Sequence, residues 1–70
     1  MNELENFKNC WIKEVMFSEL REGQVLMNVL FQYDYETYKD ITGTEYDCFY
    51  DNKKINSTLN YLRKRWSNVS

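Results

Sequence analysis

Four residues near the C-terminal end of the chain have side chains suited to binding a phosphate and a base. Lys54, Tyr61, Lys64 and Arg65 fall on one side of a predicted helix, opposite its apolar stripe, when successive residues are placed about 100° apart. Ammonium and guanidinium groups bind phosphate by charge-assisted hydrogen bonds, and an aromatic ring stacks on a base. This basic strip is therefore a candidate site for a nucleotide or a nucleic acid. A solvated basic face and a dock for an acidic protein are the alternatives.

A second polar strip is expected on an earlier helical segment. Arg21, Gln24 and Asn28 follow one another at the spacing i, i+3, i+7 and so share one helix face. Amide and guanidinium side chains in this arrangement can bind a ligand by hydrogen bonds. The simpler interpretation is the exposed face of the helix.

Catalytic and metal chemistry lack the residues they need. The chain contains no His, and Cys10 and Cys48 do not form a C-x-x-C pair, so a zinc site has too few ligands. No Ser or Cys stands in a nucleophile context. Asp47 and Asp51 lack the spacing of a calcium loop, and we interpret them as acceptors for free backbone N–H groups in a connector that Cys48 and Phe49 pin to the core. We therefore expect no catalysis, no metal and no cofactor.

Charge is distributed unevenly along the chain. The net charge is −2, but residues 1–50 hold ten acids and four bases, whereas residues 51–70 hold one acid and five bases. Residues 34–51 alone carry six acids against one base. Such an acidic segment can mimic a nucleic-acid duplex, although a charged rim that keeps an aromatic-rich oligomer in solution is the simpler interpretation.

Chain length and apolar patterning limit the location and the assembly of the protein. A chain of 70 residues buries only about 60% of its unfolded surface, so we expect a homo-oligomer. The apolar run at 25–31 is too short to span a bilayer. Residues 1–17 carry charges throughout and lack the apolar segment of a signal peptide, which predicts a cytoplasmic protein without a membrane partner.

Apolar periodicity predicts a mainly α fold, a single compact bundle of three longer helices and one short helix. The longer helices are expected at 3–16, 18–32 and 51–67, and the short one at 35–41, closed by Gly43. Ser18 and Asp51 are the expected N-caps of the second and last helices. Gly23, inside the second helix, indicates close approach of another backbone. The alternation of aromatic and acidic residues at 31–38 leaves a short strand or hairpin as the alternative there.

Two further local expectations concern the helix ends and faces. Asn2 and Glu5 form a variant of the capping box at the start of the first helix. Leu20 and Phe31 belong to a wide apolar arc on the second helix, which predicts burial on two sides.

Two patterns carry a resemblance. Residues 21–30 read R-x-G-Q-x-L-x-N-x-L, and residues 43–51 read G-T-x-x-D-x-F-Y-D. This combination resembles small uncharacterised proteins encoded by tailed phages and prophages, over residues 20–66. The resemblance implies a phage origin and, with it, a host-directed or counter-defence role; it brings no reaction, ligand or partner with it.

The expected function is therefore a small non-catalytic binding protein that inhibits a host protein one to one, with a defence component such as a CRISPR effector as the leading target. Candidate anchors for such an interface are Tyr33, Tyr35, Tyr38 and Tyr50, where they are exposed. One alternative is an oligomeric sponge that sequesters a nucleotide immune signal between subunits, through the basic strip. Another is a small nucleic-acid-binding accessory protein that uses the same helix.

Overall fold

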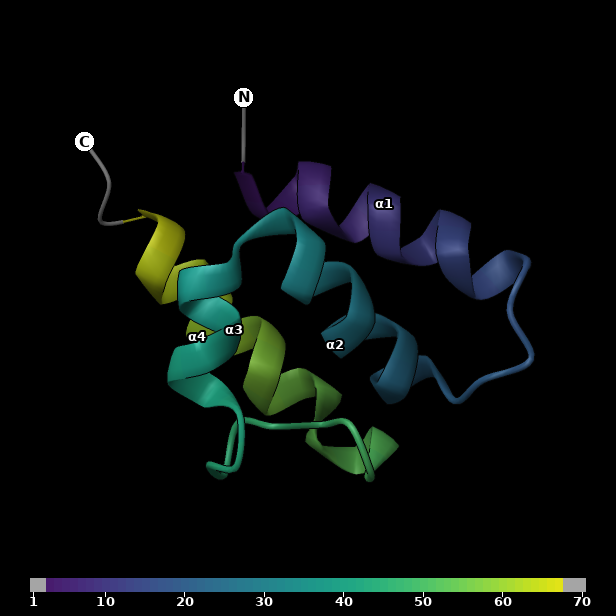
Figure 1. Cartoon of the computed structure of the whole chain (residues 1–70). Helices are drawn as coiled ribbons and strands as arrows, with labels where there is room; N and C mark the ends of the chain where they lie inside the picture. The colour runs from purple at the N-terminus through teal and green to yellow at the C-terminus, as the bar shows by residue number, and fades with distance from the viewer. Residues whose placement is uncertain (1–2, 68–70) are drawn as a thin grey trace.

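The computed structural model describes residues 3–67, which form a compact all-α globule of four helices without strands (Figure 1). The helices are α1 (Glu3–Met16), α2 (Glu22–Tyr33), α3 (Tyr35–Ile41) and α4 (Ile55–Ser67), and a 3₁₀ turn, η1 (Asn52–Lys54), precedes α4. Helix α2 contacts α1, α3 and η1, and α1 also contacts α4. The mainly α prediction, with three longer helices and one short one, is confirmed.

The alternative of a strand or hairpin at 31–38 is wrong. This segment completes α2, turns at Asp34 and starts α3. Asp34 caps α3, since its carboxylate accepts hydrogen bonds from the backbone N–H and the hydroxyl of Thr37. Phe31, near the end of α2, consequently packs edge on against Tyr35 and Tyr38 of α3, so these rings meet across the turn at Asp34.

The core is a single apolar cluster around Phe7. Its buried members come from α1, α2, α3, the connector and α4: Phe7, Leu26, Met27, Leu30, Ile41, Cys48 and Leu62. The ring of Phe7 meets the rings of Tyr33 and Trp66 edge on, both at a centroid distance of 5.4 Å. Such aromatic pairs add roughly 0.5–1.5 kcal/mol to the apolar burial, and here they join α1, α2 and α4.

The start of α2 differs from the prediction. Ser18 does not cap the helix: its hydroxyl accepts a hydrogen bond from the N–H of Leu20 at 3.0 Å and holds the turn before it. Helix α2 begins only at Glu22, and the side-chain oxygen of Asn52 accepts the N–H of Gly23 at 2.9 Å. A residue 29 positions later thus supplies the acceptor that a local cap would have provided.

Gly23 lies where another backbone approaches closely, as predicted. A Cβ at this position would overlap the carbonyl oxygen of Cys48. The Cys48 thiol in turn donates to the carbonyl oxygen of Gly23 at 3.5 Å, and burial raises the pKa of this thiol. Both Cys48 and the exposed Cys10 are free thiols.

Two apolar residues of the expected arc are not buried. The exposed fractions of Leu20 and Phe31 are 48% and 50%. Leu20 precedes the helix, because α2 starts later than predicted, and Phe31 lies outside the core and packs against the aromatic rings of α3. The capping box expected at Asn2 lies outside the described residues.

The last helix also begins later than predicted. Asp51 caps η1, since its carboxylate accepts the N–H of Lys53 at 2.9 Å, and α4 follows from Ile55 to Ser67. None of the helices within residues 3–67 is long and apolar enough to cross a membrane.

The carboxylate of Asp34 predicts how stability should change with pH. Burial alone would raise its pKa, but hydrogen bonds from Thr37 and Trp66 and the charge of Arg65 outweigh burial, so the pKa of Asp34 is lowered. An unfolded Asp has a pKa of about 3.9, so the unfolded chain binds this proton first as the pH falls. The contribution is present above about pH 4 and is lost as the pH falls through the lowered folded-state pKa.

We therefore expect the urea concentration at the unfolding midpoint to decrease as the pH is lowered from about 5 to about 2.5. The decrease should be smaller in Asp34→Asn, because its side chain cannot ionise. The two curves would be compared by circular dichroism. Parallel curves for the two proteins would show that Asp34 does not contribute to the acid sensitivity.

Candidate functional site

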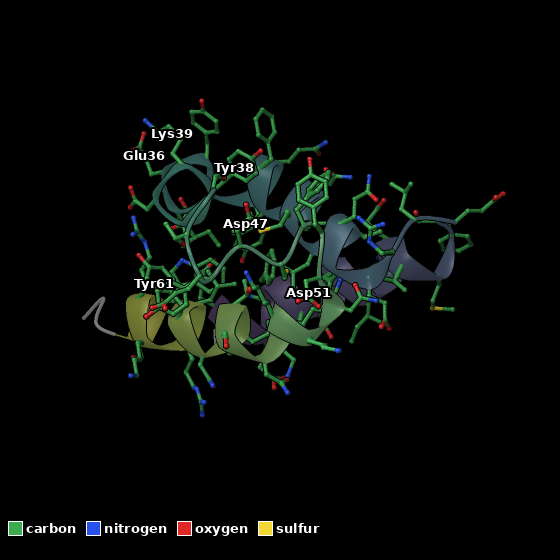
Figure 2. The ribbon with its side chains drawn as sticks, turned by 90° about the horizontal axis from the view of Figure 1, so that it is seen from below. Glu36, Tyr38, Lys39, Asp47, Asp51 and Tyr61 are labelled. Carbon is green, nitrogen blue, oxygen red and sulfur yellow. The ribbon has the colours of Figure 1, made fainter. Side chains whose placement is uncertain are left out.

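The connector between α3 and η1 is fixed by its own acidic residues (Figure 2). Gly43 adopts a φ of 80° and ends α3, a backbone conformation that suits glycine. The two carboxylate oxygens of Asp47 accept the N–H groups of Gly43 and Phe49, each at 2.9 Å. The interpretation of Asp47 and Asp51 as acceptors for backbone N–H groups is confirmed, and Cys48 is fully buried beneath the loop.

The two halves of the sequence pattern meet in space. The guanidinium of Arg21 donates to the carbonyl oxygen of Phe49 at 3.1 Å. Gly23 lies against Cys48, and its backbone N–H donates a hydrogen bond to the side-chain oxygen of Asn52. Arg21 and Gly23 therefore hold the connector against the start of α2, which gives both residues a structural role.

An aromatic face covers one side of α2, α3 and the connector. It consists of Phe31, Tyr35, Tyr38, Phe49 and Tyr50. Phe31 meets Tyr35 and Tyr38 edge on, with centroid distances of 5.2 and 5.1 Å, and Phe49 meets Tyr50 at 4.7 Å. Tyr35 remains 50% exposed and Tyr50 82% exposed. Such exposed rings, already held in place by neighbours, are the side chains that dominate protein interfaces.

The two groups of rings are joined by a hollow of about 180 Å³, which we call the aromatic hollow. Its lining residues come from α2, α3 and the connector: Met27, Tyr38, Thr42, Asp47, Phe49 and Tyr50. Tyr38 and Asp47 are labelled in Figure 2. Three aromatic residues and one acidic residue thus line the hollow.

Within the basic strip, two members have partners in the chain. Arg65 donates to the carboxylate of Asp40 at 2.6 Å and to the hydroxyl of Tyr61 at 3.3 Å. The ring of Tyr61 lies 4.8 Å from that of Tyr46. Lys64 is exposed on α4, whereas Lys54 is exposed at the end of η1. A base or phosphate would have to displace these contacts to use Tyr61 and Arg65.

The polar strip on α2 does not form a single site. Arg21 is engaged with Phe49, Gln24 is half-buried, and Asn28 is exposed. Asn28 lines a different hollow, the α1–α2 groove, which does not include Arg21 or Gln24.

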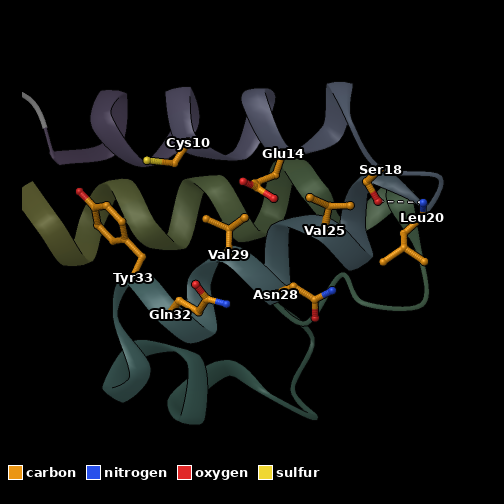
Figure 3. A pocket seen from close by; sticks show the side chains of 9 residues that line it. All are labelled: Cys10, Glu14, Ser18, Leu20, Val25, Asn28, Val29, Gln32 and Tyr33. Carbon is orange, nitrogen blue, oxygen red and sulfur yellow. Dashed lines mark hydrogen bonds between the residues drawn. The ribbon is translucent and has the colours of Figure 1, made fainter.

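The α1–α2 groove has a volume of about 410 Å³ and is larger than the aromatic hollow (Figure 3). Its lining is Cys10, Glu14, Ser18, Leu20, Val25, Asn28, Val29, Gln32 and Tyr33. Glu14 projects from α1 and faces the side chains of α2. A third hollow, of about 250 Å³, is lined by Glu3, Tyr33, Asp34 and Trp66.

Each of these three hollows is lined by at least one carboxylate and by no Lys or Arg. In the third hollow the hydroxyl of Tyr33 donates to the carboxylate of Glu3, and burial together with that bond raises the pKa of Tyr33 to about 12. Phosphate groups require cationic or N–H-rich surroundings, so the hollows suit neutral or cationic groups better than nucleotides.

The sequence predicts four tyrosines as anchors where they are exposed: Tyr33, Tyr35, Tyr38 and Tyr50. In the structure, three of them belong to the aromatic face and one does not. Tyr35 and Tyr50 are exposed and Tyr38 lines the aromatic hollow, whereas Tyr33 packs against Phe7. Phe31 and Phe49 were missed as parts of this face. The spacing of Phe31, Tyr35 and Tyr38 at i, i+4, i+7 was the signal that could have found the first of them.

Metal ligands are not brought together in the described part of the chain, where no group of three Cys, His, Asp or Glu side chains could hold an ion. Comparison of the chain with protein-family models, with curated proteins and with solved structures gave no match.

Proposed function

We propose that the protein is a small non-catalytic binding protein of phage origin that inhibits a host protein by binding it one to one. A defence component such as a CRISPR effector is the leading target class. The observation that carries this proposal is the aromatic face, which combines exposed rings with a hollow lined by half-buried Tyr38 and Phe49 and by exposed Tyr50. Burying such rings against a partner removes a large apolar area from water without any chemical step.

The aromatic face has features that favour specific binding of one partner over nonspecific hydrophobic association. Its rings are held by one another, so little side-chain freedom is lost on binding. Glu36 and Glu45 are exposed on α3 and the connector, so charge borders the aromatic rings along the chain. A polar rim around an aromatic centre is the usual anatomy of a protein interface.

The two alternatives receive less support from the geometry. A nucleotide sponge needs cations at a hollow, and a nucleic-acid-binding protein needs a free basic strip. The three hollows contain no Lys or Arg, and Arg65 is paired with Asp40. Binding to a nucleic acid would also weaken steeply between low and moderate salt, because each phosphate contact releases counterions.

The proposal is tested by native mass spectrometry on tagged protein purified gently from a bacterial host. We expect a host protein bound at one copy per chain. A homo-oligomer that carries an added mass of a few hundred daltons, in the order of a single nucleotide, would favour the sponge instead. The same spectrum tests the predicted homo-oligomer, for which the exposed Met16 and Phe17 are candidate apolar contacts outside the aromatic face.

Tyr50→Ala should weaken partner binding by about 30-fold or more, as expected for a central aromatic anchor. Because Tyr50 is 82% exposed, the substitution should leave stability nearly unchanged. Isothermal titration calorimetry against the captured protein measures the effect. Phe17→Ala is the matched control, since Phe17 is 84% exposed but lies outside the aromatic face. Equal losses in the two variants would exclude the aromatic face as the binding surface.

A further inference from the structure

We infer that the aromatic hollow takes an arginine side chain of the bound protein. This inference rests on the proposed function and names the chemistry of the partner. The hollow lies between α3 and the connector, and its walls are the rings of Tyr38, Phe49 and Tyr50. The face of an aromatic ring carries partial negative charge and attracts cations placed over it.

The carboxylate of Asp47 adds a full negative charge to the lining. Each of its oxygens accepts one backbone N–H, from Gly43 or from Phe49. A carboxylate has about four acceptor positions, so two remain for an incoming donor. The N–H fork of a guanidinium matches such a carboxylate geometrically.

Charges next to the hollow also favour a cation. Residues 42–51 contain Glu45, Asp47 and Asp51 and no Lys or Arg. Arg21 donates to the carbonyl oxygen of Phe49 and brings one positive charge to this segment, so three acids stand against one base there. The connector therefore keeps an excess of negative charge, which would repel a phosphate or a carboxylate of a ligand.

The aromatic face already binds a cation of its own. The ammonium of Lys39 lies 5.2 Å from the centroid of the Tyr35 ring and 3.4 Å from a carboxylate oxygen of Glu36. This is the same combination of ring and carboxylate that the hollow offers at Tyr38 and Asp47. The hollow differs in that no cationic side chain of the described chain lines it.

The lining of the hollow favours arginine over lysine. A planar guanidinium stacks on flat rings and is more weakly hydrated than an ammonium, so less hydration is lost when it enters. The hollow is about 180 Å³ and has buried Met27 in its lining, which suits the apolar stem of a long side chain.

The test is a titration of the ¹⁵N-labelled protein, followed by two-dimensional NMR, with three small probes. N-acetyl-arginine amide should shift the amide signals of Thr42, Asp47, Phe49 and Tyr50 in a saturable way. N-acetyl-citrulline amide, which has the same length but no charge, should bind at least about tenfold more weakly. N-acetyl-lysine amide should bind more weakly than the arginine probe as well.

Two variants test whether the arginine probe binds in the aromatic hollow. Tyr50→Ala should weaken binding of the arginine probe by about fivefold or more. Phe17→Ala removes an exposed ring that lies outside the aromatic face and does not line the hollow, so it should leave binding of the probe unchanged. The inference is overturned if citrulline binds as well as arginine, if lysine binds more tightly, if the shifts lie elsewhere, or if the two variants weaken binding equally.

The outcomes also separate this inference from the proposed function. If a host protein is captured but the arginine probe neither shifts the amide signals of the hollow nor competes with that protein, the inference fails and the proposed function stands. If the probe binds as expected but no host protein is captured, the hollow binds guanidinium and the proposed function fails.

Discussion

Alanine at position 23 should destabilise the fold by about 3 kcal/mol or more, a large part of the stability of a chain of this size. The added methyl group would overlap the carbonyl oxygen of Cys48, a backbone atom that cannot rotate away. Relief requires the connector to move off α2, which also breaks the hydrogen bond from the N–H of Gly23 to Asn52. The resulting buried and unpaired groups add to the loss.

Urea unfolding followed by circular dichroism measures this effect, and Gly43→Ala is its control. Gly43 has a φ of 80° and open space around the position of a Cβ, so alanine there should cost only about 1–2 kcal/mol of backbone strain. A Gly23→Ala protein that is as stable as Gly43→Ala would show that the connector does not press against α2 in solution.

Phe7→Ala should destabilise the protein by about 3–5 kcal/mol, enough to leave much of the chain unfolded at room temperature. Phe7 is fully buried and its ring contacts Tyr33 and Trp66. Its removal therefore leaves a cavity where α1, α2 and α4 meet. In a domain this small, no second core exists among the described residues to compensate.

Ile12→Ala provides the matched control, because Ile12 lies on the same helix and is 51% exposed. We expect its urea midpoint to stay close to that of the unchanged protein. Tryptophan fluorescence follows the unfolding, since Trp66, one of the two tryptophans, packs against Phe7. If Phe7→Ala and Ile12→Ala unfold at the same urea concentration, Phe7 is not the centre of the core.

Local sequence signals predicted most of the helices but not all of their ends. The bounds of α1 and the end of α3 before Gly43 depend on neighbours in the chain, and both agree with the prediction. Ser18 has the right chemistry for an N-cap, and the local sequence therefore predicts it as the cap of α2. The true acceptor, Asn52, could not be found because it reaches Gly23 only after the chain has folded back.

The candidate site was predictable to a similar degree. The sequence offered Tyr33, Tyr35, Tyr38 and Tyr50 as anchors without indicating which of them are exposed, and only the structure shows that Tyr35 and Tyr50 are. The pairing of Arg65 with Asp40 spans 25 positions and leaves no periodic trace in the sequence. The residues of the basic strip could therefore be predicted from helix geometry. The contacts of Arg65 and Tyr61 could not, because their partners come close only in the folded chain.

The support that Asn52 gives to Gly23 has a consequence for synthesis on the ribosome. Helix α2 acquires the acceptor for its first turn only when residue 52 has left the exit tunnel and η1 has formed. Helices α1 and α2 can collapse together earlier, but the beginning of α2 should remain frayed until then. A nascent chain stalled before residue 52 should therefore be cleaved by proteases around residues 18–24, and one released after α4 should resist them.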